Sequence, residues 1–189
     1  VLSNQFSALT PENAMKFGPI HPGRYTYNFA PADYIVNYAT QSTMGVHAHT
    51  LVWHNQNPAW LTNTVWTSNE LAAILYDHIS NVVGRYTGAV QIWDVVNEPL
   101  KSNGSLRDSF WNTILGPGYI DLALNYTREI DPETQLLIND YNVADLNSKS
   151  DGLYALAADL LSRGIPLDGV GFQCHWNATS PPPVDEIVS

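Results

Sequence analysis

The sequence predicts an α/β fold, a (β/α)8 TIM barrel here truncated to about five βα units. Short apolar runs alternate with segments of helical periodicity, which is typical of parallel strands joined by helical crossovers. The centres of these runs, near residues 7, 50, 93, 137 and 171, are separated by 43, 43, 44 and 34 residues. Polar residues follow every run, as expected at the C-terminal mouth of a barrel.

The five strand candidates are Gln5 to Leu9, Val46 to Trp53, Val90 to Val96, Leu136 to Ile138 and Val170 to Phe172. A doubly wound sheet would also fit the alternation of strands and helices. That fold binds its ligand at one switch point, whereas here polar residues trail all five strands and no G-x-G-x-x-G sequence follows any of them. The barrel is therefore favoured over the doubly wound sheet.

Helix candidates lie between the strands. The clearest is Ser68 to Tyr86, in which seven apolar residues recur at helical spacing. Pro31 to Ala39 opens with a first-turn proline, and Tyr119 to Ile130 ends before Asp131-Pro132. Ser148 to Arg163 is expected to begin with a Ser148…Asp151 capping pair.

The length of the chain is short for a closed barrel. A (β/α)8 barrel typically needs about 250 residues, whereas this chain has 189. Its last segment, Ser180 to Val188, is expected to form a proline-opened helix. We therefore expect residues 1–189 to be a fragment of one domain rather than a complete barrel.

Composition narrows the class of ligand. The chain has 8 Lys and Arg against 18 Asp and Glu, a formal net charge of −10 that opposes binding to nucleic acid or to an anionic membrane surface. No apolar run approaches the roughly 20 residues that span a bilayer. Only 14% of residues are charged, and Trp and Tyr supply 16 of the 21 aromatic residues. This composition suits a neutral, hydroxyl-rich ligand.

The segment Trp93 to Pro99 is the most informative one. It is an apolar strand that delivers Asn97 and Glu98 to the barrel mouth. A carboxylic acid whose pKa is raised by burial or by a second carboxylate can protonate a leaving oxygen there. The alternative is that Glu98 is an exposed loop acid, the usual situation of glutamate.

Two histidines, His47 and His49, are two residues apart and so lie on one face of their strand. With His175 and Asp140 they could bind zinc, which gives a rival hypothesis of a metal-dependent hydrolase. The other alternative is a pair of hydrogen-bonded core histidines. We expect no metal and no cofactor.

Polar side chains with hydrogen-bonding capacity cluster in the segment 10–17. Glu12, Asn13 and Lys16 could together bind several hydroxyl groups. The competing interpretation is an ordinary solvated helix start, with Glu12 favoured by the helix dipole.

In the segment 169–176, Gln173 and His175 share one strand face and could orient a catalytic carboxylate. Cys174 is expected on the opposite face as a small buried residue. Because it is the single cysteine, it cannot form an internal disulfide.

From about Asn4 to Trp176 the chain resembles glycoside hydrolase family 10 xylanases, and five ordered motifs carry the resemblance. They are Thr-Pro-Glu-Asn-Ala-Met-Lys at 10–16, His-Thr-Leu-Val-Trp-His at 49–54, Trp-Asp-Val-Val-Asn-Glu at 93–98, Ile-Asn-Asp-Tyr-Asn at 138–142 and Gly-x-Gln-x-His at 171–175. By this resemblance, residues 1–189 are a partial family 10 catalytic domain.

The resemblance implies endo-hydrolysis of internal β-1,4-xylosidic linkages in xylan with retention of configuration, by two glutamates about 5 to 5.5 Å apart. Glu98 matches the acid/base, and Asn97 matches the residue that binds the sugar 2-hydroxyl. Gln173 and His175 match residues beside the nucleophile, and Tyr141 and Asn142 fall on the leaving-group side. The wall on the non-reducing side is matched by Glu12, Asn13, Lys16, His49, Trp53 and Gln56.

One departure from the family pattern concerns the nucleophile. In the family it is a glutamate in a Thr-Glu-Leu/Phe-Asp motif on the seventh strand, and these 189 residues contain no such motif. Glu129, Glu133 and Glu186 stand in helical or turn contexts, so none takes that role. The five strands correspond to strands two to six of the barrel, and we expect the chain alone to be inactive.

The resemblance also implies a secreted, extracellular, monomeric protein that binds xylan and xylooligosaccharides. Three sequons, at Asn103, Asn125 and Asn177, could accept N-linked glycans. If the chain is complete by nature, the alternative is a non-catalytic xylan-binding protein.

Overall fold

The structure is a computed structural model that describes residues 2–179, 181 and 183–187. Its centre is a parallel sheet in the order β1-β2-β3-β4-β5, so every strand pairs with its neighbour in sequence. The strands are β1 (Ala8–Leu9), β2 (Gly45–Trp53), β3 (Ile92–Asn97), β4 (Gln135–Asp140) and β5 (Gly169–Phe172). This sequential, all-parallel order confirms the predicted α/β class and is that of five consecutive barrel units.

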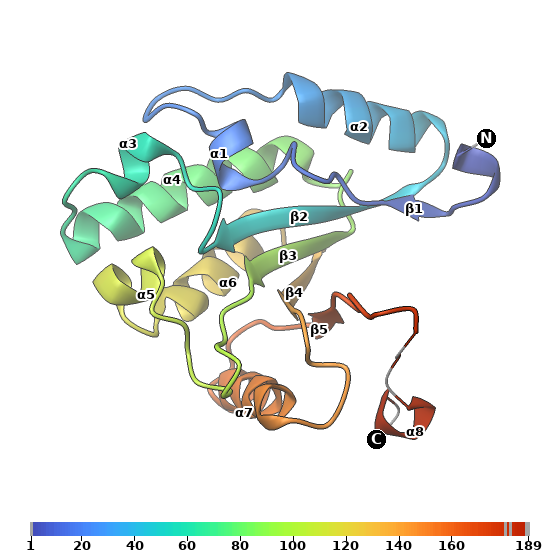
Figure 1. The fold of residues 1–189 in the computed structure, drawn as a ribbon. Helices are drawn as coiled ribbons and strands as arrows, with labels where there is room; N and C mark the ends of the chain where they lie inside the picture. Colours follow the sequence, from blue (N-terminus) through green and yellow to red (C-terminus); the bar gives the residue numbers. More distant parts are fainter. Residues whose placement is uncertain (1, 180, 182, 188–189) are drawn as a thin grey trace.

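The helices follow the strands around the sheet (Figure 1), with α2 and α7 at its two ends and α4 and α6 between them. The four long helices are α2 (Ala30–Gln41), α4 (Ser68–Tyr86), α6 (Tyr119–Ile130) and α7 (Ser148–Ser162). The short ones are η1 (Leu2–Asn4), α1 (Phe17–Ile20), α3 (Ala59–Thr62), α5 (Phe110–Leu115) and α8 (Val184–Ile187). The long helices match the predicted segments to within two residues at each end. None of the helices in the described ranges is long and apolar enough to cross a membrane.

The start of α7 differs from the prediction. The N-cap is Asn147, whose side chain accepts hydrogen bonds from the backbone of Lys149 and Ser150, while the Ser150 hydroxyl donates to the Asn147 carbonyl. Ser148 therefore lies inside the first turn, and the expected Ser148…Asp151 capping pair is wrong. An amide oxygen caps a helix as well as a hydroxyl does, so Asn147 and Ser150 form the capping box one residue earlier than predicted.

The segment 10–17 also differs from the expected helix start, because α1 begins only at Phe17. The backbone amide of Gly18 donates to the Gln56 carbonyl at 2.9 Å, and a Cβ at Gly18 would lie 2.5 Å from that oxygen. Only glycine permits this approach. Residues 10–16 are thus held as turns against the loop that follows β2.

The core fills the space between the sheet and the long helices. Trp93 of β3 and Trp111 of α5 are fully buried, and the apolar stripe of α4 contributes Leu71, Leu75 and Ile79. Burying each large apolar side chain contributes roughly 1.5–3 kcal/mol relative to leaving it in water. This packing fixes the C-terminal ends of the strands, where the polar residues gather.

Candidate active site

An open cleft of about 620 Å³ lies at the C-terminal ends of the strands and is lined from all five βα units. Eight of the residues singled out by the sequence line it: Glu12, Lys16, His49, Trp53, Asn97, Glu98, Gln173 and His175. They come from positions up to 163 residues apart in the chain. The fold thus brings most of the predicted site into one cavity.

The carboxylate of Glu98 is held from both sides. Glu98 directly follows β3, where its backbone amide donates to the Asn139 carbonyl at 2.7 Å. The indole of Trp53 donates to one carboxylate oxygen at 2.9 Å, and the amide of Gln173 donates to the other at 3.0 Å. Only 12% of the side chain is exposed, and it faces the cleft. The arrangement gives Glu98 a fixed, partly buried acid position.

A second carboxylate, Asp94, lines the cleft between two histidines. Nε2 of His47 and Nδ1 of His49 each lie 2.8 Å from one of its oxygens. Burial raises the pKa of Asp94, but the hydrogen bonds from His47 and His49 outweigh burial and leave the pKa below its ordinary value. The bond to Asp94 fixes the ring of His49, whose other nitrogen is then available to the cleft.

These contacts bear on the zinc hypothesis. His47 and His49 use ring nitrogens to bind Asp94, and within the described ranges no group of three or more His, Cys, Asp and Glu side chains is arranged to hold a metal ion. The His-x-His pair is instead part of a hydrogen-bonded network that supports the cleft.

An amide cluster lies beside Glu98. The side chain of Asn97 contacts that of Asn139 at 3.0 Å and that of Gln173 at 3.2 Å. A Cβ at Gly171 would lie 2.6 Å from the Asn139 side chain, so glycine is needed for β5 to pass this close. Asn139 and Asp94 were not singled out from the sequence, although each is a polar residue within a buried strand.

The wall opposite this cluster is built from the N-terminal segment. Lys16, which is almost fully buried, donates to the Asn13 side chain at 3.0 Å, and its ammonium lies 5.1 Å from the centre of the Trp53 ring. Asn13 therefore contacts a residue that lines the cleft. A cation, an amide and an indole together offer donors and an apolar face, the combination that binds a sugar ring.

Besides Asn13, three predicted site residues lie outside the cleft lining. Tyr141 and Asn142 stand in the loop that follows β4, and Gln56 stands in the loop that follows β2. The Lys149 ammonium nitrogen lies 3.3 Å from the centre of the Tyr141 ring, and the Tyr141 hydroxyl contacts Arg107. The structure places these residues beside the cleft rather than within it.

Of the five non-glycine residues with a left-handed conformation in the described part of the chain, four lie at this same end of the sheet, and the fifth, Thr43, precedes β2. Gln56, Glu98, Asn142 and Cys174, which follow β2, β3, β4 and β5 in turn, have φ between 52° and 55°. Such conformations cost of order 1 kcal/mol or more each and cluster at functional sites. At Cys174 the turn also overturns a prediction: β5 ends at Phe172, strand alternation stops there, and Cys174 is exposed instead of buried.

Comparisons with known proteins agree with this geometry. The profile of Glycosyl hydrolase family 10 matches residues 1–188. Endo-1,4-beta-xylanase B of Thermotoga neapolitana is 47% identical over 175 residues, which are 93% of this chain and 51% of that protein. Endo-1,4-beta-xylanase A of Fusarium oxysporum is 41% identical and is matched over 95% of this chain and 55% of its own length.

Solved structures give the same result. Native xylanase 10B from Thermotoga maritima superposes with a TM-score of 0.95 at 44% identity, covering 98% of this chain and 57% of that one. Xylanase 10B from Thermotoga petrophila in complex with xylobiose has a TM-score of 0.89 at 47% identity, covering 90% of this chain and 52% of that one. The chain thus spans about half the length of the relatives that it matches.

Proposed function

The chain belongs to glycosyl hydrolase family 10, and from this premise we propose that it is part of an endo-β-1,4-xylanase that cleaves internal linkages of xylan with retention of configuration. The observation that carries the proposal is the carboxylate of Glu98, held at the cleft by Trp53 and Gln173. The relatives named endo-1,4-β-xylanases and the neighbouring structure that holds xylobiose supply the substrate class.

In the proposed mechanism, Glu98 serves as acid and then as base. In the first step a nucleophilic carboxylate attacks the anomeric carbon, the bond from that carbon to the glycosidic oxygen breaks, and Glu98 gives its proton to the departing oxygen. In the second step the Glu98 carboxylate takes a proton from water as the water oxygen displaces the enzyme carboxylate. Two displacements at one carbon return the original configuration.

The nucleophile of this mechanism comes from outside the 189 residues, which contain no Thr-Glu-Leu/Phe-Asp motif. We place it on a further strand of the longer protein, next to β5, because Gln173 and His175 line the cleft at that side. The proposal therefore concerns the full-length protein, and this chain contributes the acid/base and most of the sugar wall.

The proposed roles in sugar binding follow the resemblance to the family. Asn97, beside Glu98, binds the 2-hydroxyl of the sugar that is attacked. Glu12, Asn13, Lys16, His49, Trp53 and Gln56 hold the sugars on the non-reducing side, and Tyr141 and Asn142 hold those on the leaving-group side. The buried Lys16 and the Asp94-bound His49 have fixed orientations, which lowers the entropy cost of binding.

The experiment that tests the proposal uses the full-length protein and a series of aryl β-xylobiosides. The substitution Glu98→Gln should slow the cleavage of substrates with poorly acidic phenols by about 10²-fold to 10⁴-fold, the range for general acid catalysis. Cleavage of substrates with acidic phenols should keep its rate, because these phenols leave without a proton. The matched control is Glu133→Gln, since Glu133 is an exposed glutamate at the other end of β4. This substitution should leave the cleavage rates of both groups of substrates unchanged. Equal slowing across the series would reject the acid role.

We further propose that the full-length protein is a secreted, extracellular monomer. The size of xylan, a polymer too large to enter a cell, supports the extracellular location. The sequon residues Asn103, Asn125 and Asn177 are exposed and so accessible to glycosylation. One neighbouring structure is described as an intracellular xylanase, so an intracellular location is the alternative that the experiment must distinguish. Xylanase activity and protein mass in culture medium and cell lysate test this, and a product found only in the lysate would contradict it.

A further inference from the structure

The segment that follows Glu98 folds back on itself. The amide of Lys101 donates to the Ser105 carbonyl at 2.8 Å, Leu100 pairs with Leu106 in an antiparallel bridge, and the amide of Arg107 donates to the Pro99 carbonyl at 2.7 Å. This loop, residues 98–107, which we call the acid loop, begins at Glu98 and ends at Arg107. The side chain of Arg107 consequently lies beside the residue that starts the loop.

The guanidinium of Arg107 joins the acid loop to the next one. Its Nε donates to the Glu98 carbonyl at 3.1 Å, and one terminal nitrogen donates to the Leu100 carbonyl at 2.8 Å. That same nitrogen donates to the Tyr141 hydroxyl at 3.3 Å. One planar cation therefore holds the backbone on which Glu98 stands and the phenol of the loop that follows β4.

The backbone at Glu98 needs such support. Its φ of 55° is strained for a residue with a Cβ, and strained residues keep their conformation only where their surroundings fix it. A charged donor makes a stronger hydrogen bond than a neutral one does. The contact from Arg107 to the Glu98 carbonyl is thus suited to hold the backbone, and with it the direction of the carboxyl group.

Tyr141 is fixed from its other side by a buried ion pair. The ammonium of Lys149 donates to the Asp140 carboxylate at 2.6 Å and to the Tyr141 carbonyl at 2.8 Å. The second oxygen of Asp140 accepts from the Leu100 amide at 3.3 Å, which ties this pair to the acid loop as well. The ring and backbone of Tyr141 are held by Lys149, so the contact that Arg107 adds is to the hydroxyl.

We propose that Arg107 is a positioning residue that sets the spacing between the acid Glu98 and the leaving-group wall at Tyr141. The inference rests on the proposed function, since it assigns Arg107 a part in the same reaction. A sugar that departs must stay aligned while its glycosidic oxygen receives the proton from Glu98. Arg107 makes the two loops that perform these tasks move as one body.

The test uses full-length protein with Arg107→Met, Arg107→Lys, Tyr141→Phe and the double variant Arg107→Met/Tyr141→Phe. Two substrates are compared. Cleavage of xylohexaose has a sugar as its leaving group. Cleavage of an aryl xylobioside releases an acidic phenol, which needs neither a proton from Glu98 nor contact with the sugar wall. Arg107→Met should lower kcat/KM for xylohexaose between about 10-fold and 100-fold, the range for hydrogen bonds to a charged donor, and for the aryl substrate less than about threefold. Arg107→Lys should recover only part of the loss, since one ammonium cannot reach all three acceptors.

The double variant measures the coupling. Because Tyr141→Phe removes the same hydrogen bond, the double variant should lose less for xylohexaose than the product of the single losses. Lys101→Met, which removes an exposed cation from the same loop, is the matched control and should leave the ratio between the two substrates unchanged.

Equal losses on both substrates for Arg107→Met and Arg107→Lys, with Tyr141→Phe acting independently, would overturn the inference and leave Arg107 a purely structural residue. If Arg107→Met does not fold, the substrate ratio of Arg107→Lys decides in the same way. A wild type that does not cleave xylohexaose, or a Glu98→Gln variant insensitive to the leaving group, would instead mean that the proposed function has failed.

Discussion

The buried pair His21 and His78 is an unusual local feature of the molecule. The two Nδ1 atoms lie 3.3 Å apart, both side chains are fully buried, and Nε2 of His21 lies 3.3 Å from the Arg24 carbonyl. If His21 donates to that carbonyl, its Nδ1 must accept from His78. Nε2 of His78 is then a buried acceptor, and it has no hydrogen-bond partner among the residues that the structure describes. Protonation of His21 would set two N–H groups against each other, and protonation of His78 would create a buried N–H donor without an acceptor.

This pairing predicts a loss of stability in mild acid. Burial lowers the pKa of both His21 and His78 below the ordinary value of 6.5, so the unfolded chain binds more protons than the folded one. Stability is therefore complete above about pH 6.5 and falls as the pH decreases, by about 1.4 kcal/mol per pH unit for each proton.

His78→Phe keeps an aromatic ring stacked on Phe17. It should reduce the slope of stability against pH by up to the value that corresponds to one proton. Denaturant unfolding of the full-length protein between pH 7 and pH 5 measures the slope. Identical slopes for the wild type and the variant would show that His78 is not the group that resists protonation.

At the same scale, the sequence indicated some site residues and missed others. Glu98 and Asn97 could be predicted because a buried strand ends in polar side chains. Asp94 was missed because its two partners, His47 and His49, lie 45 or more residues away in the chain on the neighbouring strand. An acid in the middle of an apolar strand was the available signal, since a buried carboxylate needs partners.

Among the elements, the contact between the acid loop and α7 depends on two glycines. A Cβ at Gly152, in the first turns of α7, would lie 2.4 Å from the Gly104 carbonyl, and Gly104 itself has a φ of 81°. Backbone meets backbone there, so no side chain can move aside. This contact sets how closely the acid loop approaches Lys149 and Tyr141.

Gly152→Ala should therefore destabilise the protein by about 1–3 kcal/mol, the cost of overpacking, although alanine is favoured over glycine within a helix by about 1 kcal/mol. Gly118→Ala, at the start of α6, is the matched control, because its φ is −65° and no atom of the described residues lies within 4 Å of the added Cβ. It should be neutral or stabilising. Denaturation midpoints compare the two variants, and a stabilised Gly152→Ala would show that the loop does not pack on α7.

The elements themselves could be predicted to different degrees. Helices α4 and α6 have long apolar periodicity, and their bounds match the prediction. The short helices α1, α3 and α5 could not be predicted, since four to six residues contain too little periodicity and are held by tertiary contacts such as that of Gly18 with Gln56. The turn at Cys174 was missed because nothing in the local sequence marks a left-handed residue.

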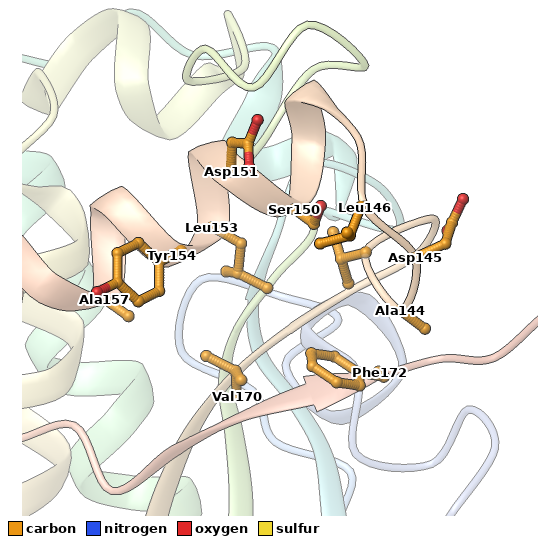
Figure 2. Close-up of a pocket in the computed structure, with 11 residues that line it drawn as sticks. Ala144, Asp145, Leu146, Ser150, Asp151, Leu153, Tyr154, Ala157, Val170 and Phe172 are labelled. Carbon is orange, nitrogen blue, oxygen red and sulfur yellow. The ribbon is translucent and has the colours of Figure 1, made fainter. Parts of the chain in front are cut away.

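For the molecule as a whole, the sheet is an arc whose edge strand β5 carries an apolar outer face. Val170 and Phe172 are 37% and 45% exposed and, with Leu153, Tyr154 and Ala157 of α7, line a pocket of about 330 Å³ (Figure 2). The described residues therefore leave this face incompletely buried. This exposed apolar face and the absence of the nucleophile motif both predict that the 189-residue chain differs in activity from the full-length protein.

We expect the 189-residue chain alone to release sugar from xylan at least about 10³-fold more slowly than the full-length protein, because a covalent nucleophile is missing. Reducing-sugar assays on equal molar amounts measure this. Co-expression with the remaining part of the full-length protein should restore activity, which separates a missing group from a misfolded chain. Comparable turnover by the chain alone would contradict the assignment of the nucleophile to another segment.

The most direct measurement is azide trapping with full-length Glu98→Ala. Without the base, water attacks the glycosyl-enzyme slowly, whereas azide needs no proton removed and can attack the same carbon. On an aryl xylobioside with an acidic phenol, azide should therefore raise turnover and yield β-xylobiosyl azide, while Glu133→Ala gives none. An α-azide product, or no response of Glu98→Ala to azide, would contradict the role of Glu98 as the acid/base of a retaining xylanase.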